Sequence, residues 1–185
     1  MKRVSRVNNR PFHPETLMMG YGYDPFLSEG AVKPPVFLTS TFAFRKAEEG
    51  KQFFEWAYGL RQRDPEKDPE MGLIYSRLNN PDLEILEDRL ATWENAEKAL
   101  VFSSGMSAIT TGIMSLVKPG QEIISTNPVY GGTDFFFEQI CPAWNIKVHR
   151  VTACSDAPAR IKKLLDERKG KIAMVYIETP SNPTN

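Results

Sequence analysis

Residues 103–106, Ser-Ser-Gly-Met, have the types and spacing of an anion-binding loop. They follow a short apolar run at 99–102, which we expect to be a strand, and they lead into a helix predicted over 104–117. The first turn of a helix has unpaired backbone N–H groups and a partial positive charge, and Gly105 lets a ligand approach the main chain closely. The sequence therefore predicts an anion site of phosphate size here. A capped helix start without a ligand is the alternative.

Strand and helix signals alternate after residue 98 and predict the elements that hold this loop. Strands are expected at 99–102, 122–126, 146–151 and 172–177, and helices at 104–117, 133–141 and 158–170. Strands separated by helices predict an α/β fold with a mostly parallel sheet covered by helices on both faces. Ligands bind beyond the carboxyl ends of such strands, where segments 103–106, 127–132 and 178–184 fall together.

Three helices carry apolar stripes that we expect to be buried. A helix over 81–93 starts at a proline and has apolar residues at helical spacing. The residues expected to face the core are Leu83, Leu86, Leu90 and Trp93 in this helix, Met106, Ile109, Ile113 and Leu116 in the next, and Ile161, Leu164 and Leu165 in the last.

The first 75 residues are rich in proline, glycine and aromatic residues and show little sustained periodicity. We interpret 1–75 as an extended arm and subunit-contact segment, and 76–185 as the first part of a larger ligand-binding domain. The aromatic run at 53–56 predicts that part of the arm docks on an apolar surface, while the charged stretch 59–69 is expected to be a solvated loop.

Composition narrows the function classes. The 23 basic and 23 acidic residues cancel, and the 41% hydrophobic content is ordinary for a globular protein. Neither nucleic acid nor a membrane is an expected partner, and a cytoplasmic location is expected.

Cys141 and Cys154 are expected to be free thiols, and the two histidines form no metal-ligand spacing. The chain ends after a strand and a proline-rich turn, so we expect it to be part of a longer protein.

Five blocks together resemble the Cys/Met-metabolism family of pyridoxal-phosphate (PLP) enzymes, which includes cystathionine gamma-synthase, cystathionine gamma-lyase and methionine gamma-lyase. They are Ala31–Phe42, Tyr75–Pro81, Ser103–Ala108, Tyr130–Thr133 and Glu178–Thr184. The resemblance implies a fold-type I, aminotransferase-like large domain and PLP as cofactor. It also implies a lyase or transferase of sulfur amino acid metabolism, by beta- or gamma-elimination or gamma-replacement on cystathionine, methionine or activated homoserine.

The resemblance also implies roles for residues around the cofactor phosphate. Gly105 and Met106 would bind it through backbone N–H groups, with Ser104 beside them. Tyr75 and Arg77 would reach the same phosphate from a neighbouring subunit, in a homo-oligomer built as a dimer or a dimer of dimers. A surface ion pair is the alternative for Arg77.

The remaining implied roles concern the cofactor ring. Tyr130 would stack on the pyridine and exchange a proton with substrate or leaving group, although a tyrosine beside Gly-Gly is also a common packed turn residue. Asn182 would hydrogen-bond the phenolic oxygen of the cofactor, and Glu178 would support the site from the end of its strand.

Two departures from the family pattern affect this reading. Asn127 stands where most members have an aspartate three residues before the stacking tyrosine, which alters the charge near the ring. No lysine here stands in the family's Schiff-base motif, which lies after the Pro-Ser-Asn-Pro-Thr turn. We therefore expect this stretch alone to be inactive.

Two other functions compete with this one. A nucleotide-binding Rossmann domain shares the strand-glycine-helix junction, but 103–108 lacks the three-glycine spacing of the dinucleotide fingerprint. A noncatalytic truncated subunit that assembles with partner chains is the second alternative, and the missing lysine favours it.

Overall fold

A computed structural model describes residues 6–7 and 10–183. The chain divides into two compact units, Met1–Val101 and Phe102–Asn185, and each is described by itself. The sequence predicted a boundary at residue 75 between a subunit-contact arm and a ligand-binding domain. That boundary stays a prediction.

A three-stranded parallel sheet forms the centre of the second unit. Its strands are β3 (Glu122–Asn127), β4 (Lys147–Thr152) and β5 (Ile172–Tyr176), in the order β4-β3-β5. The central strand β3 is buried along its length except at Asn127 because it has a neighbour on each side and helices above and below. The predicted parallel sheet is confirmed, and its three strands begin and end within one residue of the expected positions.

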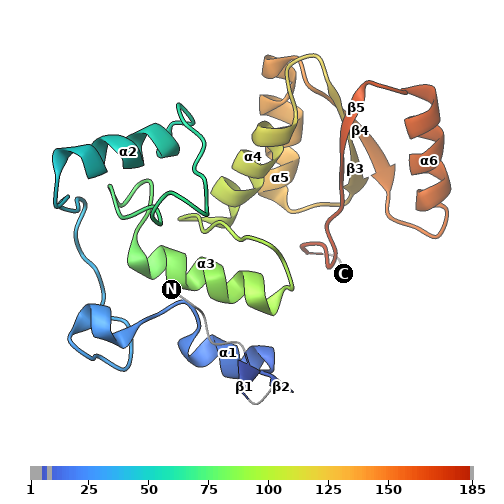
Figure 1. Ribbon diagram of the computed structural model, residues 1–185. Coiled ribbons are helices and arrows are strands. Elements are labelled where there is room, and N and C mark those ends of the chain that lie inside the picture. Colours follow the sequence, from blue (N-terminus) through green and yellow to red (C-terminus); the bar gives the residue numbers. More distant parts are fainter. Residues whose placement is uncertain (1–5, 8–9, 184–185) are drawn as a thin grey trace. The chain divides into compact units, whose positions relative to one another are not determined.

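Helices cover both faces of this sheet (Figure 1). On one face lie α4 (Gly105–Leu116) and α5 (Gly131–Phe135), which continues as a π-helical turn at Phe136–Ile140 and a 3₁₀ turn at Pro142–Trp144. On the other face lies α6 (Ala157–Glu167). The expectation of helices on both faces is therefore confirmed.

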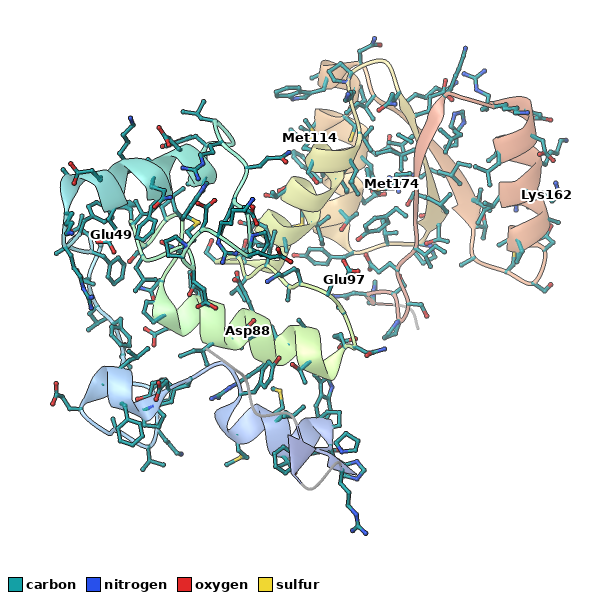
Figure 2. All side chains as sticks on the ribbon, viewed as in Figure 1. Glu49, Asp88, Glu97, Met114, Lys162 and Met174 are labelled. Carbon is teal, nitrogen blue, oxygen red and sulfur yellow. The ribbon has the colours of Figure 1, made fainter. Side chains whose placement is uncertain are left out.

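Each face of the sheet has its own apolar core. The core under α4 and α5 is built from Ile113, Val117, Ile123, Phe136, Phe137, Cys141 and Ile146. Met114 of α4 and Met174 of β5 pack against it, and both are labelled in Figure 2. The smaller core under α6 contains Ile124, Val151 and Ala157, with Ile161 and Leu164 against them. Leu116 and Leu165 are exposed, so their predicted burial was wrong.

The strand expected at 99–102 is absent from the structure. A strand is stable only when its backbone groups pair with a neighbouring strand. Here the N–H of Val101 donates to the Glu87 carboxylate at 2.9 Å instead, and Leu100 is 74% exposed. Apolar residues alone therefore did not make this segment a strand.

The first unit is mostly helices and irregular chain. Its elements are β1 (Arg6–Val7) paired with β2 (Arg10–Pro11), α1 (Pro14–Gly20), a 3₁₀ turn at Pro25–Ser28, α2 (Ala47–Ala57) and α3 (Pro81–Trp93). Residues 29–45 form neither helix nor strand apart from one bridge between Thr41 and Tyr75, as expected of an extended arm. The sequence reading missed α2, although Glu48 and Glu49 in its first turn favour a helix start.

Helix α3 begins and ends at the predicted residues, but it buries a different face. The expected stripe Leu83, Leu86, Leu90 and Trp93 is 38–50% exposed, while Ile85 and Ala91 are buried. The buried face also carries Asp82 and Arg89, at helical spacing from Ile85. Asp82 accepts the N–H of Phe37, and Arg89 donates to the carbonyl of Tyr21. These polar contacts draw the N-terminal segments onto that side of the helix.

A buried ionic cluster lies at the amino end of the parallel sheet. Glu122, the first residue of β3, accepts from His149 of β4 at 2.6 Å and from Arg168 after α6 at 2.9 Å. The Arg168 guanidinium, followed by His149, lowers the pKa of Glu122 from 4.5 to about 2. The cluster ties three elements together at this end.

Two kinds of feature are absent from the described part of the chain. No helix there is both long and apolar enough to cross a membrane. The same residues contain no group of three or more histidine, cysteine or acidic side chains that could hold a metal ion.

Candidate active site

The start of α4 is an open cradle for an anion. Ser104 caps the helix, its hydroxyl accepting the N–H of Ser107 at 3.1 Å. Gly105 and Met106 occupy the first two helical positions, where N–H groups have no acceptor within the helix. A Cβ placed on Gly105 would meet nothing within 4 Å beyond its two chain neighbours and the helix backbone. The main chain is therefore free to be approached by a phosphate, which fits the group predicted for this loop.

Tyr130 stands beside this cradle. It precedes α5, and its ring is 42% exposed. A Cβ built on Gly132 would lie 2.6 Å from a ring carbon of Tyr130 and 2.8 Å from the sulfur of Met106. The ring of Tyr130 and the side chain of Met106 therefore flank the same point, and the phosphate cradle and the aromatic face lie together in one unit.

Glu178 connects the Tyr130 segment to the turn after β5. Its Oε1 accepts the backbone N–H of Tyr130 at 2.6 Å and that of Asn182 at 3.4 Å. Its Oε2 accepts the hydroxyl of Tyr176 at 3.3 Å, and its own N–H donates to Thr126 at 3.3 Å. Glu178 thus holds backbone groups from two separate segments at the carboxyl end of the sheet.

Two asparagines lie at the same end of the sheet. Asn182 is exposed in the turn after β5, and the hydroxyl of Ser181 fastens this turn by donating to the carbonyl of Pro128 at 3.0 Å. Asn127, which departs from the family pattern, is exposed at the end of β3. Thr184, the last residue of the fifth resemblance block, lies outside the described residues.

Tyr75 and Arg77 belong to the first unit and are both exposed. The Arg77 guanidinium lies over the Tyr75 ring, 5.5 Å from its centroid. The segment is fixed by Ser76, whose N–H donates to the carbonyl of Ser40 at 3.0 Å, and by Asn80, which caps α3 and donates to Ser76. Within residues 10–183 no ion pair of Arg77 is found, so the surface ion pair considered as an alternative is not formed there.

Burial determines the chemistry of Tyr176 near the site and of Cys141 in the apolar core. Burial raises the pKa of Tyr176, so its hydroxyl stays protonated and donates to Glu178. Burial also raises the pKa of the Cys141 thiol, which lies in the apolar core and is unsuited to act as a nucleophile. Both cysteines are free, as expected.

Sequence reasoning missed three residues of this site: Thr126, Gly132 and Tyr176. A signal existed for two of them. Tyr176 and Glu178 are two residues apart on one extended segment, so their side chains leave the same face. Thr126 is a polar residue in a strand expected to lie inside the sheet, which is a reason to look for a buried hydrogen bond. The contact of Gly132 with the Tyr130 ring depends on side-chain orientation and has no sequence signal.

Comparison with known proteins gives consistent relatives. The chain is 35% identical to the L-methionine gamma-lyase of Pseudomonas deceptionensis over 95% of its length, and 33% identical to the O-acetyl-L-homoserine sulfhydrylase of Leptospira meyeri over 94%. It spans 40% and 36% of the lengths of these two relatives.

A solved structure shares the fold. The putative O-acetylhomoserine (thiol)-lyase of Campylobacter jejuni, which carries a pyridoxyl-lysine phosphate, superposes with a TM-score of 0.78 at 24% identity, covering 93% of this chain and 38% of that one. The protein-family model described as Cys/Met metabolism PLP-dependent enzyme matches residues 15–185. The chain therefore belongs to the family of Cys/Met-metabolism enzymes whose cofactor is pyridoxal phosphate.

Proposed function

We propose that this chain contributes the phosphate cradle and one ring face to a PLP-dependent lyase or transferase of sulfur amino acid metabolism. The observation that carries the proposal is the junction at Gly132, where Met106 from the start of α4 and the ring of Tyr130 flank one point. A phosphate on the helix start would place an attached aromatic ring within reach of Tyr130. The family relatives that act on methionine and on O-acetylhomoserine support the substrate class.

Each residue has a distinct task in this proposal. The N–H groups of Gly105 and Met106, with Ser104, bind the phosphate. Tyr130 stacks on the cofactor ring, and its hydroxyl moves a proton to or from the substrate. Asn182 donates to the phenolic oxygen of the cofactor, and Glu178 holds the backbone of Tyr130 and Asn182. PLP, when bound, supplies the electron sink that stabilises negative charge on the substrate's alpha carbon.

The activity is tested with the protein in its full natural length and added PLP. Release of a keto acid from methionine, homocysteine or cystathionine would show elimination. Formation of homocysteine from an activated homoserine and sulfide would show replacement. We expect one of these reactions. A protein that binds PLP and performs neither would contradict the proposal and favour the noncatalytic assembly subunit.

We further propose that Tyr75 and Arg77 serve the phosphate site of a neighbouring subunit in a homo-oligomer. Arginine suits this task because its planar fork pairs with two phosphate oxygens, and Arg77 is exposed. The test mixes Arg77→Ala subunits with subunits inactivated at Tyr130 by Tyr130→Phe. Some activity should return in verified heterodimers, because one of the two sites then has both residues intact. No recovery would place the whole site within one chain.

The 185-residue stretch by itself should bind PLP weakly and reversibly and show no elimination. Covalent attachment needs a lysine in the family's motif, and none stands there in this sequence. Borohydride reduction followed by mass spectrometry checks this. One stoichiometric adduct on a single lysine, together with keto acid release, would contradict it. A cytoplasmic location also stays a prediction.

A further inference from the structure

Gly132 is a glycine for reasons of space. It lies in α5 and has no positive φ, so its backbone conformation is open to any residue. Alanine is the better helix former at such a position. However, a Cβ there would lie 2.6 Å from Cε1 of Tyr130, 2.8 Å from the sulfur of Met106 and 3.3 Å from Cγ of Met106. Real Cβ atoms essentially never approach other atoms within 3.0 Å, so both side chains would have to move.

The backbone of Tyr130 is held independently of its ring. The Glu178 carboxylate accepts its N–H at 2.6 Å, and the same oxygen accepts the N–H of Asn182. Tyr176 and Thr126 fix the two ends of Glu178. Because this hold acts on the main chain, the side-chain torsions of Tyr130 remain to be set by what the ring contacts, and Gly132 is the close contact.

We propose that Gly132 is a positioning residue that sets the orientation of the Tyr130 ring against Met106. This inference rests on the proposed function for its catalytic consequence, because the ring is useful only where it faces the cofactor and the substrate. A methyl group at position 132 rotates the ring out of its place and displaces the thioether of Met106, while Glu178 keeps the backbone of Tyr130 where it is. Tyr130 then remains present but misdirected.

The neighbouring glycine offers a matched control. Gly131 lies in the same helix, yet a Cβ on it would meet nothing within 4 Å beyond its two chain neighbours and the helix backbone, and so would not meet Met106. Gly131→Ala and Gly132→Ala add the same atoms to adjacent positions of one helix. They differ in whether the new methyl group meets the side chain of Met106.

The first readout needs neither cofactor nor activity. The full-length protein is labelled with ¹³C in its methionine methyl groups, and the Met106 signal is assigned with Met106→Leu. We expect the ring of Tyr130 to shift this signal, Tyr130→Leu to abolish the shift, Gly132→Ala to change it, and Gly131→Ala to leave it in place. A Met106 signal that is the same in wild type and Gly132→Ala would overturn the proposal, whether or not the enzyme is active.

The second readout separates positioning from folding. With PLP bound, Gly132→Ala should lower kcat by about 10²-fold, as expected for a displaced catalytic group, with little change in PLP affinity. Gly131→Ala should keep the wild-type kcat. An unchanged kcat in Gly132→Ala would contradict the proposal. If the wild-type protein shows no activity, the proposed function fails while the methionine signal still decides this inference.

A third variant covers the case in which Gly132→Ala does not fold. Combining it with Tyr130→Ala removes the ring that the methyl group meets. Recovery of folding in the double variant, measured by thermal unfolding, would support a clash with Tyr130. Failure of the double variant as well would overturn the proposal.

Discussion

The two ends of strand β3 use carboxylates in opposite ways. At the amino end, Glu122 is buried and is held by two side chains, His149 and Arg168. At the carboxyl end, Glu178 accepts the backbone N–H groups of Tyr130 and Asn182. The Glu122 carboxylate thus binds other side chains, whereas the Glu178 carboxylate binds backbone N–H groups.

This difference separates stability from function within one sheet. In the amino-end cluster each charge has its partner, so little is left there to recognise a ligand. At the carboxyl end the backbone is held by Glu178, while the Tyr130 hydroxyl and the side-chain amide of Asn182 make no hydrogen bond to another described residue. Those groups are left to act on a ligand. We therefore expect changes at the amino end to affect folding and changes at the carboxyl end to affect turnover.

The largest effect is expected from Tyr130→Phe in the full-length protein. The ring remains and the hydroxyl is lost, so PLP should stay bound while turnover falls by roughly 10²–10⁴-fold, the usual loss for a missing acid–base group. Steady-state kinetics and the midpoint of thermal unfolding are measured together. An unchanged turnover number would show that Tyr130 is a packing residue. It would also contradict the expectation that changes at the carboxyl end of the sheet affect turnover.

A smaller effect, on stability, is expected from Glu122→Gln. The substitution keeps the shape of the side chain but leaves Arg168 and His149 without their carboxylate, and losing one partner of a buried ion pair is destabilising. The midpoint of thermal unfolding should fall by several degrees with kcat unchanged.

The matched control for Glu122→Gln is Asp166→Asn. It breaks the 2.8 Å pair with Lys162 on the exposed side of α6, where Figure 2 shows Lys162, and exposed pairs contribute little. The control should unfold at nearly the wild-type temperature. Equal shifts in the two variants would mean that the amino-end cluster stabilises no more than a surface pair.

The smallest effect is the pH dependence of the same cluster. The pKa of Glu122 is depressed from 4.5 to about 2 in the folded protein, so its stabilising contribution is complete above pH 4.5 and is lost as the pH falls towards 2. Unfolding of wild type and Glu122→Gln is followed by denaturant titration across this range. The stability difference between them should shrink with acidification, and a difference that stays constant to pH 2 would contradict the assignment.

The sequence predicted the second unit better than the first. Alternation of apolar runs and turn residues located β3, β4, β5 and α6 to within a few residues, because a buried parallel sheet demands that pattern. The run at 99–102 has the same pattern without a pairing strand, and its Val101 N–H went to Glu87. The buried face of α3 is set by polar contacts with Phe37 and Tyr21, which lie far away in the sequence. The apolar pattern within the helix itself carries no information on such contacts.

The same limit applies to the site. Helix-start chemistry and the family resemblance predicted the roles of Gly105 and Tyr130, and the structure sets both at the carboxyl end of the sheet. The close approach of Gly132 to Tyr130 and Met106 could not be foreseen, because it depends on two side-chain conformations. The hydrogen bond of Glu178 to Thr126 joins residues 52 positions apart, which only the pairing of β5 with β3 brings together.

The strand order β4-β3-β5 also sets the order in which a ribosome can complete these contacts. The central strand is made first, and its second neighbour is made last. The Tyr130 N–H precedes its acceptor Glu178 by 48 residues. At synthesis rates of about 5–20 residues per second it waits roughly 2–10 s for that partner. The nascent chain thus builds its scaffold before the turn at Asn182 can close the carboxyl end of the sheet.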